Sequence, residues 1–268
     1  MAKVLQRKGT VLSNKACTDT LYLIEIAVED IPLNIAAGQF VHVKIPGMED
    51  HILRRPFSVF YVNSDTSSLV ILYQVVGHGS LRLTQLKKGD ELDLMGPIGH
   101  GWRIPAQEPK KALLVAGGVG GAPLFMHAQD LLNAGFDVEV ILGAQTKDAL
   151  VVLDSYKTLL DGHIHIATDD GTLGHKGFCT DLVVSELHSN KPNYVACCGP
   201  EPMMKIVSQM CLDAQVPTAI SLEKKMACGI GACLACVCES KEIDSHSKVK
   251  NKRICKDGPV FLSTDIEL

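Results

Sequence analysis

The sequence predicts a multidomain chain in which an N-terminal antiparallel β-barrel precedes a doubly wound α/β domain and a small cysteine-rich C-terminal subdomain. Three observations support this prediction. The chain has 268 residues, more than one domain usually contains. Near residue 106 the apolar segments change from short β-like runs to an alternation of apolar strands and helical segments. Because closely spaced cysteines follow residue 220, we place the domain boundaries at 1–105, 106–220 and 221–268.

The overall composition argues against some function classes. A formal net charge of −4 and a pI near 6.2 give no reason to expect nucleic acid or an anionic membrane surface as a partner. The start of the chain lacks the apolar run of a signal peptide, and no apolar stretch approaches the length of a membrane span. We therefore expect a soluble cytoplasmic protein, in which ten cysteines indicate metal or redox chemistry rather than disulfides.

The first region has the rhythm of β structure. Short segments rich in Val, Ile, Leu and Tyr are separated by Gly, Pro, Asn and Asp at turn-like spacing, which is typical of an antiparallel barrel or sandwich. The one candidate for a helix in this region is 79–86. The expected strands are 20–28, 39–45, 54–62, 68–76 and 90–96.

The second region alternates between apolar runs and helical segments. Short, almost wholly apolar runs are typical of parallel strands covered on both faces, and the alternation favours a doubly wound α/β domain. Pro123 stands where a first helical residue is expected. The expected strands are 112–118, 137–144, 163–170 and 193–200, and the expected helices are 123–135, 148–160, 178–190 and 201–214.

The third region contains a cysteine motif. Cys228, Cys233 and Cys236 form the pattern C-x4-C-x2-C, and Cys255 offers a fourth thiolate further along the chain. This is the spacing of plant-type [2Fe–2S] proteins. Zinc is the main alternative, but structural zinc sites usually use two separate short spacings and only one C-x2-C occurs here. Cys238 is an alternative fourth ligand; we prefer Cys255, because a ligand from a distant segment can close the far side of a cluster.

Small residues lie between the first two cysteines of the motif. Gly229, Gly231 and Ala232 let the backbone curl closely around a cluster and leave N–H groups free to point at sulfur. The region is therefore predicted to be a [2Fe–2S] subdomain whose order depends on what the cysteines bind. Four scattered cysteines are interpreted instead as small buried hydrophobic residues: Cys17, Cys179, Cys197 and Cys211.

Three strand ends of the second region carry turns suited to a nucleotide. Gly117, Gly118 and Gly120 lie between an apolar strand and a helix start, where glycines permit close approach to a pyrophosphate. The turn departs from G-x-G-x-x-G, and a purely structural turn explains the glycines equally well. The segments 197–204 and 167–174 leave two further strands, and ligands of open α/β sheets lie beyond the carboxyl ends of the strands.

Two acidic residues in one of these turns bear on the choice of nucleotide. Asp169 and Asp170 follow the third expected strand, where the ribose of an adenosine would lie. A carboxylate there accepts from a 2′-hydroxyl and repels a 2′-phosphate, which favours NAD over NADP. A solvated acidic turn is the alternative interpretation.

The segment LRRPFSVF, residues 53–60, suggests a second anion site in the first region. Arg55 and Ser58 provide a cation and a hydroxyl suited to a phosphate or to the polar edge of a ring. Adjacent arginines in an apolar strand are unusual unless something anionic pairs with them. Further along, Gly79 and Ser80 offer donors to a phosphate, and Tyr73 either packs on a flat ring or takes part in ordinary strand packing.

The order of these motifs carries a family resemblance. R-P-F-S, G-G-V-G-G-A-P, C-G-P-E-P-M and the cysteine motif follow one another along the whole chain. The chain resembles the ferredoxin reductase-like flavoproteins, and its C-terminal C-K-D-G-P-V-F looks most like the electron-transfer subunits of NAD-dependent dihydroorotate dehydrogenases. The resemblance implies that FAD is bound by Arg55, Pro56, Phe57, Ser58, Leu72, Tyr73, Gln74, Gly79 and Ser80. It also implies a [2Fe–2S] cluster on Cys228, Cys233, Cys236 and Cys255, and a nicotinamide near Cys198, Gly199 and Met203.

The resemblance further implies a reaction and a partner. Dihydroorotate would be oxidised to orotate on a separate FMN-containing subunit, and this chain would pass the electrons through [2Fe–2S] and FAD to NAD⁺. It implies a heterotetramer of two subunits of each kind and no catalytic acid or base in this chain. Two alternatives stay open: a reductase of the same build that serves an oxygenase, a ferredoxin or a sulfide dehydrogenase, and a zinc-stabilised binding module without flavin.

Overall fold

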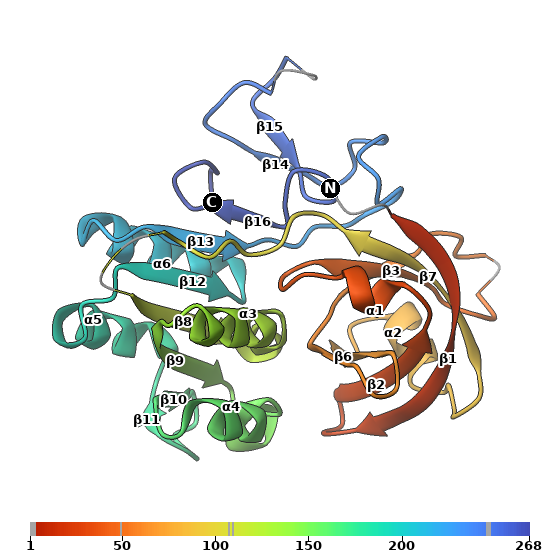
Figure 1. The fold of residues 1–268 in the computed structure, drawn as a ribbon, viewed down its shortest axis with the longest axis horizontal. Coiled ribbons are helices and arrows are strands. Elements are labelled where there is room, and N and C mark those ends of the chain that lie inside the picture. Colours follow the sequence, from red (N-terminus) through yellow and green to blue (C-terminus); the bar gives the residue numbers. More distant parts are fainter. Residues whose placement is uncertain (1–3, 49, 107, 109, 245–247) are drawn as a thin grey trace.

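In the computed structural model two large sheets lie side by side, and the C-terminal segment lies across the border between them (Figure 1). The structure describes residues 4–48, 50–106, 108, 110–244 and 248–268. One sheet is antiparallel and belongs to the first region, the other is mostly parallel and belongs to the second, and a two-stranded sheet belongs to the third. The predicted fold class is confirmed. In the described part of the chain no helix combines the length and the apolarity that crossing a bilayer would need.

The first sheet has seven strands in the order β4-β3-β7-β1-β2-β6-β5, and all of its pairings are antiparallel. Two short helices lie in its connections. The elements are β1 (Leu5–Ala16), β2 (Leu21–Val28), α1 (Ile31–Asn34), β3 (Phe40–Lys44), β4 (Arg55–Ser58), β5 (Tyr61–Asn63), β6 (Ser68–Gln74), α2 (His78–Leu83) and β7 (Glu91–Ile98). β1 falls in a segment where no strand was predicted.

The chain path requires this sheet to curl into a barrel. β4 and β5 lie at opposite edges of the sheet, yet only Val59 and Phe60 separate them in sequence. Three Cα steps span about 11 Å at most, so the two edges must come together. The backbone N–H of Phe60, in this two-residue link, donates to Val70 O of β6 at 2.8 Å. The R-P-F-S segment, which is β4, is thereby placed at the barrel seam.

The second sheet is doubly wound, as predicted. Its order is β11-β10-β9-β8-β12-β13-β16, so the chain starts in the centre, moves to one side and then returns to the other. The elements are β8 (Lys111–Gly117), α3 (Gly121–Asn133), β9 (Asp137–Ala144), α4 (Leu153–Leu160), β10 (Ile164–Thr168), β11 (His175–Lys176), α5 (Cys179–Ser189), β12 (Tyr194–Cys198), α6 (Glu201–Asp213) and β13 (Thr218–Ser221). Two 3₁₀ turns, 118–120 and 147–149, complete this region.

Helices cover both faces of this sheet, which explains why its strands are apolar throughout. In β8, Leu114 belongs to the apolar cluster that contains residues of α3 and α4. Its neighbours Leu113 and Val115 belong to the cluster that contains residues of α5 and α6. Because successive strand residues face opposite sides, both sets are buried and no polar face remains.

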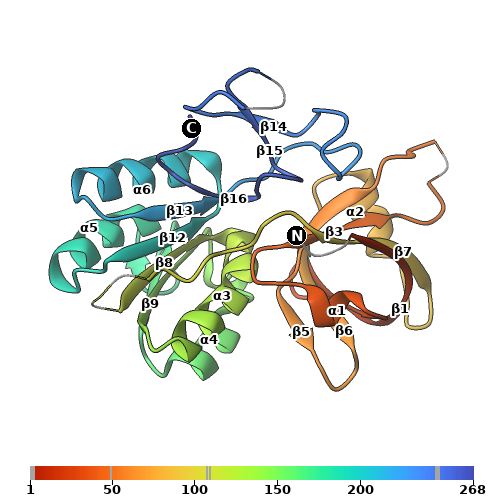
Figure 2. The same cartoon turned by 45° about the horizontal axis from the view of Figure 1, so that its top comes forward.

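The C-terminal segment ties the two large sheets together (Figure 2). Its hairpin pairs β14 (Val237–Glu239) with β15 (Asn251–Arg253), and β16 (Val260–Leu262) adds an antiparallel edge to the second sheet next to β13. The backbone N–H of His100, just after the barrel, donates to Gly258 O at 2.6 Å. β13 runs across the predicted boundary at 220, and the division of the chain into three domains at 105 and 220 remains a prediction.

Candidate cofactor-binding sites

An open cleft of about 440 Å³ lies beside β4 and the start of α2. Six of the nine residues predicted for FAD line it: Arg55, Pro56, Phe57, Gln74, Gly79 and Ser80. The remaining lining comes from four residues that the sequence reasoning did not single out: His51, Val76, Gly77 and His78. Three of these lie between Gln74 and Gly79, so their position in the sequence could have indicated that they line the cleft. Nothing in the sequence around His51 indicates this. β4 and α2, which are distant in sequence, meet at this cleft.

The two adjacent arginines have different partners. The guanidinium of Arg54 donates to the carboxylate of Asp93 and to its backbone oxygen, both at 2.8 Å. Arg55 lines the cleft, and its guanidinium donates to the backbone oxygens of Leu53 and Arg54. Within the described residues Arg55 has no ion pair. One cation is therefore used by the fold, and the other is available to an anion in the cleft.

The turn before α2 fits closely around Arg55. A Cβ at Gly79 would lie only 3.0 Å from Nε of Arg55, so a side chain there would displace the guanidinium. The hydroxyl of Ser80 accepts from the backbone N–H groups of Val76 and Gly77 at 2.9 and 3.2 Å. Ser80 thus orders the turn, and its expected donation to a phosphate competes with its present donation to Gly77 O at 3.1 Å.

Three of the predicted flavin residues do not line the cleft. Tyr73 is buried inside the barrel, where its hydroxyl donates to Asn14 Oδ1 at 3.1 Å and its ring stacks on Tyr22. Burial raises the pKa of Tyr73. Leu72 is buried in the apolar cluster shared with α3, and Ser58 pairs with β3 through its backbone. For Tyr73 the structure shows the packing role that the sequence left open as an alternative.

The glycine turn meets the end of β12 at the carboxyl edge of the second sheet. Cys198 pairs with Ala116 in β8 and with Ser221 in β13. A Cβ at Gly120 would lie 2.2 Å from the backbone oxygen of Cys198, so the turn and the strand end are in direct contact. The chain adds its strands on one side of β8 and then, from β12 on, on the other side. Open α/β sheets bind ligands at such a switch point.

Met203 packs against two glycines at this edge. A Cβ at Gly117 would lie 2.7 Å from Sδ of Met203, and one at Gly199 would lie 2.6 Å from its Cε. Gly118 adopts a positive φ of 56°, which a glycine accommodates without strain. Burial and the charge of Glu223 raise the pKa of the Cys198 thiol to about 12, so the thiol is neutral at ordinary pH. The structure thus brings the predicted residues of both strand ends together.

The acidic turn after β10 lies at the same edge of the sheet. Asp169 and Asp170 are both exposed, and the backbone N–H of Asp169 donates to Ala144 O at 3.1 Å. The hydroxyl and the backbone N–H of Thr172 donate to Asp170 and lower its pKa. Asp170 is thereby held by its own turn, and the carboxylate of Asp169 faces solvent.

The four predicted cluster ligands occur as two pairs of thiols. Cys228 and Cys233 interact through their side chains, and Cys236 and Cys255 do the same. Because a [2Fe–2S] cluster needs two thiolates on each iron, two pairs fit it. A single tetrahedral zinc, with Zn–S near 2.3 Å, would hold all four sulfurs about 3.8 Å apart. Among the described residues no three cysteine sulfurs lie within 4.8 Å of one another.

Backbone N–H groups point at these sulfurs, as the small residues of the motif predicted. The N–H of Gly231 donates to Sγ of Cys255 at 3.0 Å, and that of Cys233 donates to Sγ of Cys228 at 3.4 Å. Burial raises the pKa of Cys228, but the donors from Ile230, Cys233 and Ala232 outweigh it and lower the pKa to about 7. Donation by the Cys255 thiol lowers the pKa of Cys236. The loop therefore favours the thiolates of Cys228 and Cys236, the form that binds metal, whereas the pKa of Cys255 is raised because its thiol donates to Cys236.

Cys238 lies apart from the two pairs. It belongs to β14, and its thiol donates to Lys252 O at 3.6 Å. Burial raises its pKa to about 11, but the pKa of Cys255 is raised as well, so the pKa values do not separate the two thiols; position does, because Sγ of Cys255 accepts from Gly231 N–H and its own N–H donates to Sγ of Cys236. The geometry therefore favours Cys255 as the fourth ligand. Of the four cysteines interpreted as buried, Cys17 is exposed, because it lies in the turn after β1, and the other three are buried as expected.

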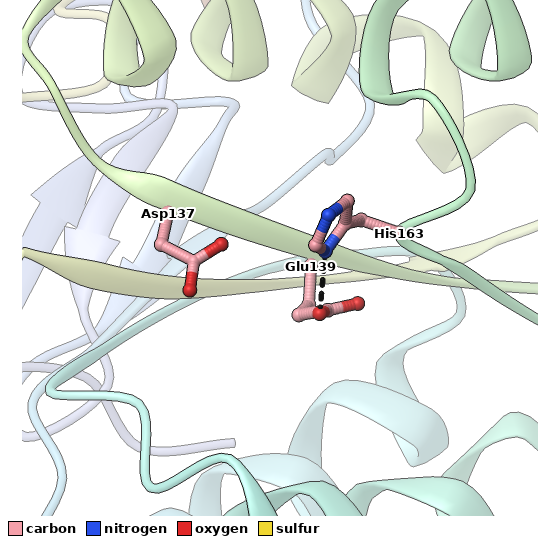
Figure 3. Close-up of side chains that lie close together, drawn as sticks. All are labelled: Asp137, Glu139 and His163. Carbon is pink, nitrogen blue, oxygen red and sulfur yellow. Dashed lines mark hydrogen bonds and ion pairs between the residues drawn. The ribbon is translucent and has the colours of Figure 1, made fainter.

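A different polar cluster lies at the opposite end of β9 and β10 (Figure 3). Ligand atoms of Asp137, Glu139 and His163 lie within 4.8 Å of one another, and Nδ1 of His163 is 2.8 Å from Glu139. His165 contacts Glu139 at 3.2 Å and Glu186 at 3.5 Å. Each imidazole already has a carboxylate partner, and these polar contacts link the start of β10 to β9 and to α5.

Three protein families match consecutive parts of the chain. The oxidoreductase FAD-binding domain matches residues 10–102, and the oxidoreductase NAD-binding domain matches residues 114–209. The iron–sulfur cluster binding domain of dihydroorotate dehydrogenase B matches residues 223–267. These ranges contain, in the same order, the cleft, the glycine edge and the cysteine pairs. The chain therefore has domains for FAD, NAD and an iron–sulfur cluster.

Whole-chain relatives agree with this order. A protein of Desulforamulus reducens, named dihydroorotate dehydrogenase B (NAD(+)), electron transfer subunit, is 39% identical over 99% of both chains. One of the same name from Fusobacterium nucleatum is 36% identical over 97% of both. A chain from the structure of NADH-dependent reduced ferredoxin-NADP oxidoreductase superposes with a TM-score of 0.85 at 28% identity, covering 97% of this chain and 89% of that one. The chain belongs to the family of electron transfer subunits of dihydroorotate dehydrogenase B.

Proposed function

We propose that this chain carries electrons from a catalytic subunit that oxidises dihydroorotate to orotate, and delivers them to NAD⁺. The observation that carries the proposal is the presence of paired cysteines, a cleft with an unpaired arginine and a nucleotide edge in one chain that matches its relatives over its whole length. When bound, FAD links the single-electron chemistry of a [2Fe–2S] cluster to the hydride chemistry of NAD.

In this proposal the chain's own residues position cofactors and transfer no protons. Arg55 supplies the fixed positive charge for the anionic part of FAD, and Gly79 leaves it room to lie in the cleft. The glycine turn at 117–120 and the end of β12 provide the close backbone approach that a dinucleotide needs. The proposed ligands of the irons are Cys228, Cys233, Cys236 and Cys255.

The remaining flavin and nucleotide assignments stay part of the proposal. The R-P-F-S strand and the β6–α2 turn would hold FAD through both side chains and backbone. Asp169, whose carboxylate faces solvent at the nucleotide edge, would accept from the ribose 2′-hydroxyl and so favour NAD over NADP. Cys198, Gly199 and Met203 would face the nicotinamide end of the nucleotide.

We further propose that the partner is an FMN-containing catalytic subunit, in a heterotetramer of two subunits of each kind. Large apolar side chains are exposed near both the flavin cleft and the cysteine pairs, which supports a protein partner there. They are Ile52, Leu53, Val76, Leu81, Ile230 and Leu234. All ten cysteines are free, which fits the reducing cytoplasm as the location.

The experiment that tests the proposal is an anaerobic visible spectrum of the purified chain with analysis of iron, labile sulfide, zinc and flavin. The proposal expects two irons, two sulfides and one FAD per chain, with the brown-orange colour of a flavin beside a [2Fe–2S] cluster. Zinc without flavin would instead favour a binding module and contradict the proposal.

A reductase that serves a different partner is the second candidate, since the chain also superposes well on a ferredoxin-NADP oxidoreductase chain. The two candidates differ in what they bind. Mixing the loaded chain with an FMN-containing dihydroorotate dehydrogenase subunit should give a stable complex that reduces NAD⁺ with dihydroorotate. Complex formation with a ferredoxin instead, and none with that subunit, would favour the second candidate.

A further inference from the structure

His42 in β3 is completely buried, yet neither ring nitrogen has a hydrogen-bond partner among the described residues. The other fully buried histidine in that part of the chain, His127, contacts the hydroxyl of Tyr194 at 3.1 Å. Buried polar atoms without partners are uncommon in native proteins because their desolvation is not compensated. An imidazole left in this state is expected to meet a partner that the polypeptide itself does not supply.

The direction of the His42 ring follows from strand alternation. Val41 and Val43 belong to the apolar core of the barrel. Phe40 belongs instead to the cluster that contains Cys236 and Cys255. Since residues i and i+2 of a strand share a face, His42 projects with Phe40 out of the barrel and toward the C-terminal segment.

The cysteine loop packs directly on this ring. A Cβ at Gly229 would lie 2.6 Å from Nδ1 of His42 and 2.9 Å from Cε of Met95. Gly229, with a positive φ of 69°, immediately follows Cys228. The imidazole therefore occupies the space next to the first residue after a proposed cluster ligand.

The flavin cleft also lies next to His42. His42 pairs with Pro56 in β4, and directly opposed residues of an antiparallel pair present their side chains on one face. Pro56 lines the cleft. His42 thus stands between the cleft and the cysteine pairs. Burial, and the nearby charge of Arg54, lower its pKa to about 4 against a contact with the backbone of Arg54 that does not reach hydrogen-bond geometry, so the ring is neutral.

We propose that His42 is a positioning residue for the cluster, donating its Nδ1–H to a sulfur of the cluster bound beside Gly229. The inference rests on the proposed function, because it requires the cysteines to hold a [2Fe–2S] cluster. A donor to sulfur stabilises the more negative, reduced form and so raises the reduction potential of the cluster. Its position beside the flavin cleft would let this one residue adjust how electrons are shared between the two sites.

The test is a redox titration of the cluster in the purified full-length chain, followed by EPR. His42→Phe keeps the ring shape but removes the donor, whereas His42→Asn places an amide N–H near the position of Nδ1. We expect His42→Phe to make reduction of the cluster about tenfold less favourable, which lowers the reduction potential by 59 mV for one electron. His42→Asn should lower the potential much less. His127→Phe, the matched loss of a distant buried histidine, should leave the potential unchanged.

An unchanged potential in His42→Phe, or equal shifts in the Phe and Asn variants, would overturn the inference. If His42→Phe does not fold, His42→Gln replaces it, because the glutamine amide reaches the position of Nε2 rather than Nδ1. Equal potentials in the Asn and Gln variants would then overturn donation from Nδ1. Absence of iron and sulfide from the wild-type chain would instead overturn the proposed function, and this inference with it.

Discussion

Replacing Gly120 by alanine should damage the nucleotide edge by a purely steric route. Gly120 has helical backbone angles, φ −62° and ψ −16°, which alanine adopts without strain. The added Cβ would, however, lie 2.2 Å from the backbone oxygen of Cys198 and 2.6 Å from its carbonyl carbon. Backbone atoms of a central strand cannot move aside as a flexible side chain can. The turn must therefore shift outward, away from the end of β12.

The size of the effect follows from this overlap. Overpacking a well-packed site costs about 1–3 kcal/mol. If the free protein relieves the contact by moving the turn, restoring the binding geometry costs up to the same amount when the nucleotide binds. At 1.4 kcal/mol per decade this amounts to roughly a 5- to 140-fold increase in the Kd for NADH. FAD content should not change, because the flavin cleft lies on the barrel.

The assay pairs an NADH titration with urea unfolding, using Gly121→Ala as the matched control. Gly121 also has helical angles, but a Cβ there would meet the side chain of Val152 at 2.8 Å rather than backbone of the nucleotide edge. Both variants should lose some stability, and only Gly120→Ala should lose NADH affinity. Equal NADH affinity in the two variants would refute the placement of the nucleotide at this turn.

Three further predictions concern the other sites. Arg55→Ala should lower the FAD retained on purification, whereas Arg54→Ala, which breaks an ion pair with Asp93, should lower stability more than flavin content; equal flavin in Arg55→Ala and wild type would contradict the cleft assignment. Cys233→Ser should abolish electron transfer to the partner yet leave NADH oxidation with an artificial dye, while Cys238→Ser should keep its iron; loss of iron from Cys238→Ser would make Cys238 rather than Cys255 the fourth ligand. Burial lowers the pKa of His127 to about 3, so the native state excludes a proton that the unfolded state binds below about pH 6.5. His127 should therefore lower stability by up to about 1.4 kcal/mol per pH unit between pH 6.5 and 3, beside a contribution of the same sign from His42 above about pH 4, and His127→Gln should reduce the slope in urea unfolding; an unchanged slope would show that His127 does not contribute to it.

The spacing of apolar residues predicted the strands and helices well where the residues of an element are buried in the same way along its whole length. Four strands of the second sheet, β8, β9, β10 and β12, were predicted to within a few residues, as were three of its four long helices, whereas β11, β13 and β16 were not predicted. The expected helix 148–160 begins instead as a 3₁₀ turn at 147–149, and α4 starts only at Leu153. The predicted strand 54–62 is two strands, because the chain crosses the barrel seam at Val59 and Phe60, and no local pattern encodes that crossing.

Strands held mainly by hydrogen bonds escaped prediction. β1 carries charged residues at Arg7, Lys8 and Lys15, and few of its side chains are buried, yet it pairs with both β2 and β7 in the centre of the barrel. β16 is three residues long, too short to show a periodic pattern, and it is a strand because it pairs with β13. In the cysteine region spacing alone identified the ligand candidates, but the choice between Cys238 and Cys255 needed the hairpin that turns one thiol toward Lys252.

The order of the second sheet also explains why the C-terminal segment, which carries Cys255, lies close to the nucleotide edge. Cys198 at the end of β12 pairs with Ser221 at the end of β13, and Ser221 pairs with Val260 in β16. Two steps of about 4.8 Å between strands place Val260 roughly 10 Å from Cys198. Val260 follows Cys255 by five residues, and Gly258 just before it contacts the end of the barrel. An added edge strand thus fixes the cysteine pairs against both sheets, which a separately folded C-terminal domain on a flexible linker would not do.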